Sequence, residues 1–308
     1  MKTVVFYYTQ SGQALSAARQ VCKPLEAGGT VVYKQIVPLQ RYPFPWSLDE
    51  FFGVFPETRL GQPPSGIQPI DFTDVEDADL VIVVGQSWFL SPSLPLQSFF
   101  TDRAVMNYLS GRPVIFMNVC RNMWLMTIRK VKGYLAAANA QLVGHIVLQD
   151  EAPNLISVLT IVRWLIHGRQ DASGLLPRAG VSSDSLASAS RFGEVILGSG
   201  GTGVRWCGGA GTRGYEGLQD RLLASGAIHY KPSILFLEKA GHRMFGFWAT
   251  FIRRKGGFGD VCRRGRARLF YYYLLVALFV VSPFAQLFFY LTYPLQDVAR
   301  HRHEDCGI

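Results

Sequence analysis

The chain has 308 residues, of which 49% are hydrophobic and 17% are charged, and its formal net charge is +9. This length leaves room for an enzyme with one large domain or two, and the low charged fraction indicates contact with a membrane. The five cysteines are odd in number, widely spaced and without a CxxC pair. This argues against a disulfide framework and a structural zinc site, so we expect reduced thiols and no bound metal.

Short apolar runs in the first half of the chain predict five buried strands. They cover residues 2–8, 30–35, 80–85, 113–119 and 141–148. Between them, apolar residues recur at helical spacing, for example at Leu15, Ala18 and Cys22. Strands that alternate with helices imply a parallel, doubly wound sheet, and such sheets bind ligands beyond the carboxyl ends of their strands.

The first strand leads into TQSGQ, residues 9–13, which we name the hydroxyl turn. A helix is predicted to start near Gly12, and its free backbone amides attract anions. Thr9 and Ser11 add hydroxyl donors, and Gly12 lets a ligand approach the backbone. The GKS or GKT of a triphosphate site and the GxGxxG of a dinucleotide site are missing. The turn therefore suits a monophosphate ester such as that of FMN, unless it is only a helix cap.

The second and third predicted strands are separated by an unusually long connection, residues 36–78. It is rich in aromatic residues, among them Trp46, Phe51, Phe52 and Phe55. We expect this insertion to form either a lid or wall for an apolar substrate, or a satellite core packed against the sheet.

Two further loops leave carboxyl ends of strands on the same edge as the hydroxyl turn. They read GQSWFLSPSLPLQSFF from Gly85 and NVCRNMW from Asn118. TQSGQ resembles the phosphate loop of flavodoxin-like proteins, and GQSWFLSPSLP resembles the segment that flanks the isoalloxazine ring in their FMN-dependent members. The resemblance covers about the first 150 residues. It implies a five-stranded flavodoxin-like sheet of order 2-1-3-4-5 that binds FMN, with departures at Ala14, commonly a hydroxyl or Asn in that family, and Ser91, commonly Gly.

A second resemblance covers nearly the whole chain. The segments YPFPWSLDEFFGVFPE, WFLSPSLP, CRNMWLM, SRFGEVIL and FLEKAGHRMFGFWATFIRRKGG, with the apolar tail, are together similar to the dialkylresorcinol condensing enzymes of bacterial aryl-lipid pathways. That resemblance implies an FMN-dependent oxidoreductase that aromatises a dialkylcyclohexane-1,3-dione. A ketosynthase-type partner would supply this lipophilic substrate.

Candidate site residues follow from this interpretation. The cofactor-binding residues are Thr9, Gln10, Ser11, Gly12, Gln13, Ser87, Trp88, Phe89, Leu90 and Asn118. Trp88 and Phe89 are expected to wall the flavin ring. The catalytic residues are Cys120, Arg121 and Asn122.

Arg121 and Asn122 are expected to stabilise a developing enolate oxygen. Cys120 is either an acyl-accepting nucleophile or a buried structural thiol. Tyr42 and His145 are candidate bases, although His145 also suits a core position.

The second half of the chain is predicted as an extension with a membrane contact. Residues 151–268 are expected to be helical and irregular, with a Gly-rich loop at 198–217 and an apolar run, LISVLTIVRWLI, that is too short to span. Residues 269–293 carry no charge, and as a helix they would extend roughly 37 Å. We expect a single membrane span, or an interfacial or re-entrant hairpin split at Pro283. The tail, 294–308, contains HRHEDC without zinc spacing.

A basic segment, residues 253–268, precedes this apolar stretch. Its position predicts contact with anionic lipid at the cytoplasmic side of the membrane and argues against nucleic acid. The opening MKTVVFYYTQ lacks the features of a signal peptide, so we expect the main domain to face the cytoplasm. Two other functions stay open: a membrane-associated quinone or electron-transfer flavoprotein, and a non-catalytic scaffold for the condensing enzyme.

Overall fold

A parallel sheet forms the centre of the protein. The computed structural model describes residues 1–200, 213–292 and 305–307. The sheet order is β2-β1-β3-β5-β6, with a short strand, β4, paired antiparallel to β3. The bounds are β1 Lys2–Tyr7, β2 Thr30–Gln35, β3 Leu80–Trp88, β4 Ser91–Pro92, β5 Pro113–Cys120 and β6 Gln141–Gln149. The five parallel strands thus have the predicted order 2-1-3-4-5, and the chain has a flavodoxin-like, doubly wound fold.

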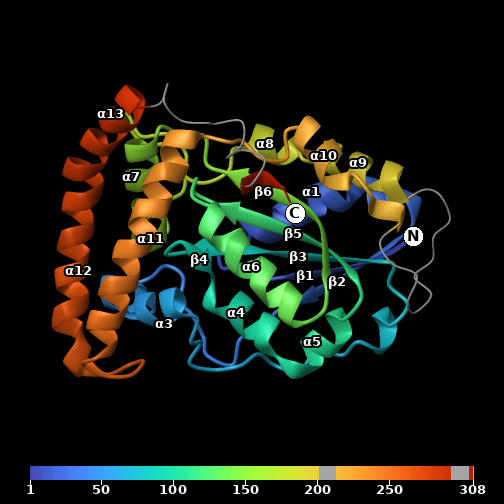
Figure 1. Ribbon diagram of the computed structural model, residues 1–308, viewed down its shortest axis with the longest axis horizontal. Helices are drawn as coiled ribbons and strands as arrows, with labels where there is room; N and C mark the ends of the chain where they lie inside the picture. Colours follow the sequence, from blue (N-terminus) through green and yellow to red (C-terminus); the bar gives the residue numbers. More distant parts are fainter. Residues whose placement is uncertain (201–212, 293–304, 308) are drawn as a thin grey trace.

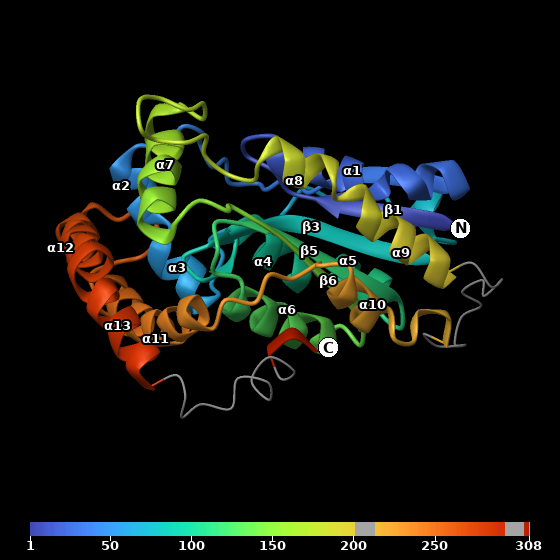
Figure 2. The same cartoon turned by 90° about the horizontal axis from the view of Figure 1, so that it is seen from above.

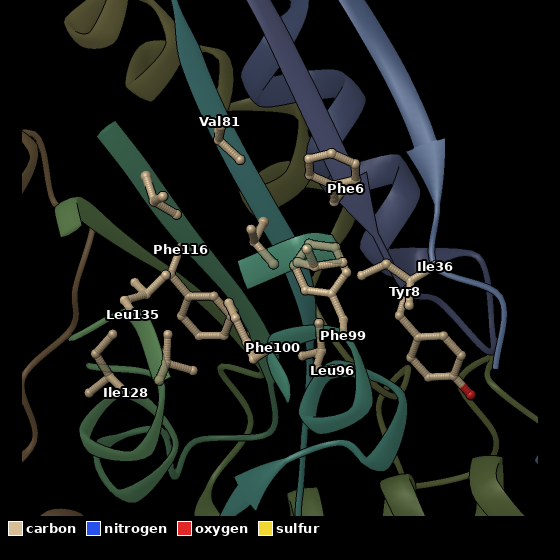
Figure 3. Close-up of a cluster of buried hydrophobic side chains, with 14 of the residues drawn as sticks. Phe6, Tyr8, Ile36, Val81, Leu96, Phe99, Phe100, Phe116, Ile128 and Leu135 are labelled. Carbon is tan, nitrogen blue, oxygen red and sulfur yellow. The ribbon is translucent and has the colours of Figure 1, made fainter. Parts of the chain in front are cut away.

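Helices cover both faces of this sheet (Figure 1). One face carries α1 (Gln13–Gly28), α8 (Ser183–Ala187) and α9 (Ser190–Gly200). The other carries α4 (Leu94–Thr101), α5 (Arg103–Leu109) and α6 (Leu125–Ala137). Figure 3 shows the second core, where Phe6 of β1 and Phe116 of β5 point toward Phe99 and Leu135 of these helices. Burial on both faces explains the near-continuous apolar sequence of the central strands.

The edge strand β6 is covered by α10 (Leu218–Ala224) and the residues that follow it. The backbone amide of His145 in β6 donates to Gln219 Oε1 at 2.7 Å, and that of Val147 donates to the carbonyl of Ala227 at 2.8 Å. Two edge amides of the strand are thereby satisfied without another chain.

The third parallel strand is longer than predicted. β3 continues past Gly85 to Trp88 and turns into β4 through Phe89 and Leu90. Both turn residues have positive φ, 47° and 60°, a conformation that usually calls for glycine or asparagine. Because Phe89 and Leu90 are neither glycine nor asparagine, the sequence predicts a loop after Gly85 and not this hairpin turn.

The insertion at 36–78 folds into short helices. Two of them, α2 (Leu48–Gly53) and α3 (Phe55–Leu60), lie near the carboxyl edge of the sheet. The third, η1 (Thr73–Val75), leads back to the amino end of β3, where the Asp79 amide donates to the Lys2 carbonyl. The side chain of Ser47 accepts from the Glu50 amide and Glu50 accepts from the Ser47 amide, which fixes the start of α2. Trp46 and Phe55 are buried in two different core clusters. The insertion is therefore a packed part of the protein.

The extension supplies five more helical segments at or near the same edge (Figure 2). They are α7 (Asn154–His167), α11 (Pro232–Arg253), η3 (Val261–Arg263), α12 (Arg264–Val276) and α13 (Ser282–Thr292), with a π turn, η4 (Ala277–Val281), between the last two. The Ser282 amide donates to the Ala277 carbonyl, and this wider turn precedes Pro283, which has no amide to donate. The helix is continuous here, so the chain does not fold back at Pro283.

Within the described residues, one helix is long and apolar enough to cross a membrane, judged by length and composition: Val261–Thr292, with mean hydropathy 2.2. Most of the predicted Gly-rich loop at 198–217, and most of HRHEDC, fall outside the described residues. The same holds for residue 293 of the predicted apolar stretch.

Candidate functional site

The hydroxyl turn forms an open helix start. Gly12 caps α1 with φ 83°, and a Cβ built on it would meet no atom within 4 Å. Among the described residues, no acceptor receives the amides of Gln13, Ala14 or Leu15. The hydroxyl of Thr9 is buried and also has no partner there. Free amides, an orphaned hydroxyl and an exposed glycine together fit a phosphate group.

The two glutamines of the turn do not face this opening. Gln10 Nε2 donates to the Pro43 carbonyl at 3.0 Å, and Gln10 Oε1 accepts from Gln86 Nε2 at 3.2 Å. Gln13 forms two hydrogen bonds of 3.2 Å with the backbone of Val181. These side chains tie the turn to the insertion, to β3 and to the extension, so the side-chain amides of both glutamines are already engaged.

The tip of β3 lies in a closed aromatic cluster. The ring of Trp88 makes edge contacts with Tyr8, Tyr42 and Trp46, at centroid distances of 6.1, 5.3 and 5.5 Å. Phe89 packs on the insertion instead, 4.7 Å from the ring of Phe51. Trp88 and Phe89 are therefore next to the expected ring site, but both are packed against other rings.

Leu90 is the last of the residues expected to flank the flavin ring, and its side chain lies against α11. One of its methyl groups is 3.5 Å from the place where a Cβ of Gly241 would lie. This contact ties the tip of the hairpin to the C-terminal helices.

Polar groups near the tips of β3 and β5 are incompletely paired. Ser87 Oγ donates to Asn118 Oδ1 at 3.1 Å and lies 2.8 Å from Thr127 Oγ1. Asn118 Nδ2 and Ser91 Oγ are buried without a partner among the described residues. Buried polar atoms rarely stay unpaired, so these atoms favour a polar ligand at this edge.

Arg121 and Asn122 meet at one oxygen atom. Arg121 Nη1 donates to Asn154 Oδ1 at 2.7 Å, and Asn122 Nδ2 donates to the same oxygen at 2.9 Å. Burial lowers the pKa of Arg121 to about 10, so its guanidinium stays charged near neutral pH. Two donors at a single point are the arrangement that an oxyanion needs. Sequence reasoning missed Asn154, which starts α7 and lies 33 residues from Arg121.

Asp150 links this pair to the hydroxyl turn. Its backbone amide donates to the Arg121 carbonyl at 2.8 Å, and its Oδ2 accepts from the Gly180 amide at 3.4 Å. Gly180 precedes Val181, which holds Gln13. The structure thus brings residues 9–13, 118 and 121–122 to one edge of the sheet.

Three candidate acid–base groups are held in their neutral forms. Burial raises the pKa of the Cys120 thiol, and Glu238 adds to the effect while Arg121 opposes it. His145 lies in the core, 5.9 Å from the stacked ring of Phe116, and burial lowers its pKa to about 3. Burial also raises the pKa of Tyr42. A thiolate nucleophile at Cys120 and a base at His145 are therefore both disfavoured.

A cavity of about 210 Å³ adjoins the aromatic cluster. Tyr42 and Trp46 of the cluster form part of its wall, and Arg263 and Ala267 of the C-terminal helical segment form another part. Among the described residues, no group of three or more His, Cys, Asp or Glu side chains is placed to hold a metal ion.

No protein-family model and no curated protein matches the sequence. Several solved structures are similar to it at low identity. A flavodoxin from an archaeon is 11% identical and is matched over 64% of this chain and 97% of its own, with a TM-score of 0.37. A flavoprotein from Lactobacillus acidophilus, solved in complex with FMN, is 16% identical over 49% of this chain and 93% of its own, with a TM-score of 0.38. The azoreductase AzrA is 10% identical and is matched over 62% of this chain and 100% of its own, with a TM-score of 0.32.

Proposed function

We propose that the hydroxyl turn binds the phosphate of FMN, and that the chain is an FMN-dependent oxidoreductase with a lipophilic substrate. The observation that carries this proposal is the open start of α1, with unpaired amides, the orphaned Thr9 hydroxyl and no Cβ at Gly12. Asn118 Nδ2, near the end of β5, and Ser91 Oγ, in β4, offer further hydrogen-bonding groups.

The reaction we favour converts a dialkylcyclohexane-1,3-dione to a dialkylresorcinol. This change removes a proton from a carbon beside a carbonyl group and a hydride from the neighbouring carbon. FMN, when bound, supplies the hydride acceptor that side chains lack. The task left to the chain is to orient the dione and to stabilise the negative charge on its oxygen when the proton leaves.

Arg121 and Asn122 are suited to that task. Their donors meet at Asn154 Oδ1, which stands in for the enolate oxygen. A substrate oxygen in its place would receive a charged and a neutral hydrogen bond. Asn154 would then release both donors, so its side chain has to turn away when substrate binds.

We place this step after a ketosynthase-type partner that joins two fatty acyl chains, on a cytoplasmic membrane with the main domain facing the cytoplasm. The resemblance of the sequence to dialkylresorcinol condensing enzymes supports the pathway. The cavity beside Tyr42 and Trp46 and the apolar C-terminal helix support a substrate with alkyl chains.

One observation favours a second candidate function. Trp88 is packed in the aromatic cluster, with only 8% of its surface exposed, so no flavin can stack on it without rearrangement. A scaffold that retains the fold without flavin and docks the condensing enzyme would have this property.

Absorbance and product analysis separate these functions. The detergent-purified protein is reconstituted with FMN and mixed with a dialkylcyclohexane-1,3-dione, and the resorcinol is sought by mass spectrometry. The proposal predicts a yellow protein and a product two hydrogens lighter than the dione. A colourless protein supports the scaffold. Quinone reduction by NAD(P)H without any resorcinol supports an electron-transfer flavoprotein.

A variant tests the oxyanion role. Arg121→Gln is expected to lower kcat by about 100-fold, because one donor to the oxyanion is lost, with unchanged flavin content. Loss of flavin in this variant, or an unchanged kcat, would remove Arg121 from the proposed mechanism.

A further inference from the structure

The long C-terminal helix has one packed face and one open face. On the packed face, the ring of Phe270 stacks on that of Phe55 in the insertion, with 3.9 Å between ring centroids. The ring of Phe289 lies 5.5 Å, between centroids, from that of Phe236 in α11. The open face is a row of exposed apolar residues three or four positions apart, which we name the outer stripe: Tyr272, Val276, Val280, Phe284, Leu287 and Leu291. An exposed stripe of this size on a soluble surface needs a partner.

The rest of the protein lies beside this helix rather than at one of its ends. α11 runs antiparallel to it, since Phe236 near the start of α11 meets Phe289, while Trp248 near the end of α11 lies 5.0 Å from Tyr273 (Figure 1). α11 is in turn fixed to the sheet domain. Glu238 accepts from the amides of Leu125 and Met126 at the start of α6.

A crossing orientation would bring α11 to the depth of the hydrocarbon. Arg243, halfway along α11, is exposed and forms no ion pair within the described residues. An unpaired arginine is unfavourable at the centre of a bilayer. The packing of α11 on the helix thus argues against a span.

The chain also returns to the sheet domain after the helix. Asp305 is buried and forms ion pairs with Arg129 of α6 at 2.9 Å and Lys239 of α11 at 3.0 Å. Gln219 Nε2 donates to the carbonyl of Cys306 at 3.0 Å. A helix that crossed a bilayer would leave residues 305–307 on the opposite side, where these contacts cannot form.

Positively charged side chains lie near the amino-terminal end of the helix that carries the outer stripe. Arg254 and Lys255, in the turn between α11 and the C-terminal helix, are exposed and form no ion pair within the described part of the chain. Exposed cations beside an apolar stripe match the headgroups of anionic lipid.

We propose that the helix from Arg264 to Thr292 lies in the plane of one leaflet of an anionic membrane, with the outer stripe immersed and both of its ends on the side of the sheet domain. The protein is then attached to one face of the membrane, and the carboxyl edge of its sheet is held beside the lipid. This inference does not depend on FMN.

Membrane topology provides the first test. The full chain is given an epitope tag before Met1 and a second tag after Ile308, and sealed inside-out and right-side-out membrane vesicles are treated with protease. We expect both tags to be digested in the same vesicle population. Digestion of the two tags in opposite populations would establish a crossing helix and overturn the proposal.

Vesicle flotation provides the second test. Phe284→Ser with Leu287→Ser removes apolar area from the outer stripe, and both positions are exposed, so folding should be retained. We expect at least about a ten-fold loss of binding to phosphatidylcholine–phosphatidylglycerol vesicles. Leu175→Ser, at an exposed apolar residue outside the helix, is the matched control and should bind as the wild type does.

Two further measurements complete the flotation test. Arg254→Gln is expected to weaken binding about five-fold at low salt, with no effect on vesicles of phosphatidylcholine alone. Equal binding of the stripe variant and the wild type would overturn the proposal. So would a detergent-free dimer in which the stripe is protected from labelling, since a second copy would then cover it.

Discussion

Among single residues, two threonines can be compared, one in β1 and one in the hydroxyl turn that follows it. Thr9 and Thr3 each have a buried Oγ1 without a partner among the described residues. Thr9 lies in the turn that leads into α1, whereas Thr3 pairs within the sheet with Val31 and Leu80, at the other end of β1. Nothing in the structure explains the unpaired hydroxyl of Thr3.

Replacement of these hydroxyls by methyl groups tests the phosphate site. Thr9→Val should leave the unfolding free energy of the flavin-free protein unchanged or raise it by up to about 1 kcal/mol, because an unpaired buried group is removed. It should weaken FMN binding about ten-fold, since a donor to a charged phosphate is lost. Thr3→Val is the control, with a similar effect on stability and none on FMN affinity. Equal FMN affinity in both variants would contradict the assignment of Thr9.

The sequence predicted the turn correctly because the strand, the glycine and the helix start are local signals. Gly12 has the expected position, one residue before α1. The partners of Gln10 and Gln13 were not predictable, because Pro43 and Val181 lie 33 and 168 residues away. Local patterns place a backbone turn, but they do not show where its side chains are engaged.

At the scale of elements, a buried carboxylate joins α11 to α6. Glu238 accepts from the Leu125 and Met126 amides at 3.1 and 2.8 Å, and burial raises its pKa to about 7 against an ordinary value of 4.5. Because the folded state holds the proton more tightly, this group favours folding below about pH 4.5 and loses that contribution as the pH rises to about 7.

Glu238→Gln resembles the protonated acid and should not titrate. The difference in unfolding free energy between this variant and the wild type should change by roughly 3 kcal/mol between pH 4 and pH 8, with the wild type losing stability relative to the variant. Urea unfolding of both proteins at each pH measures this difference in unfolding free energy. The titration of His145 and other groups cancels in the difference, so a difference that is constant with pH would show that Glu238 has an ordinary pKa.

A second link between elements is a buried ion pair. Glu57 of α3 lies 2.6 Å from Arg263, with both side chains at most 3% exposed. Glu57→Gln leaves the guanidinium uncompensated and should cost about 3–5 kcal/mol of unfolding free energy, measured by denaturant titration in detergent. The double change Glu57→Leu with Arg263→Met should recover most of this loss. Equal destabilisation by the single and double changes would show that packing, not charge, dominates there.

At the scale of the whole molecule, three distant segments cover the carboxyl edge of the sheet. These are the part of the insertion that holds α2 and α3, then α7, and the C-terminal helices from α11 to α13 (Figure 2). Apolar runs and alternating helices, which are local features, predicted the parallel sheet, and the resemblance to flavodoxin-like proteins implied its strand order. The packing of the C-terminal helices on the insertion did not, since it rests on contacts such as Glu57 with Arg263, 206 residues apart.

The binding of FMN to the hydroxyl turn is the central claim, and its most direct measurement is a fluorescence titration of the protein with FMN and with riboflavin, which lacks the phosphate. We predict saturable binding of FMN and on the order of a hundred-fold weaker binding of riboflavin. Gly12→Asp should bind FMN at least about ten-fold more weakly than Gly12→Asn, which tolerates the same positive φ without the charge. Equal affinity for both flavins, or equal affinity in the two variants, would contradict the account.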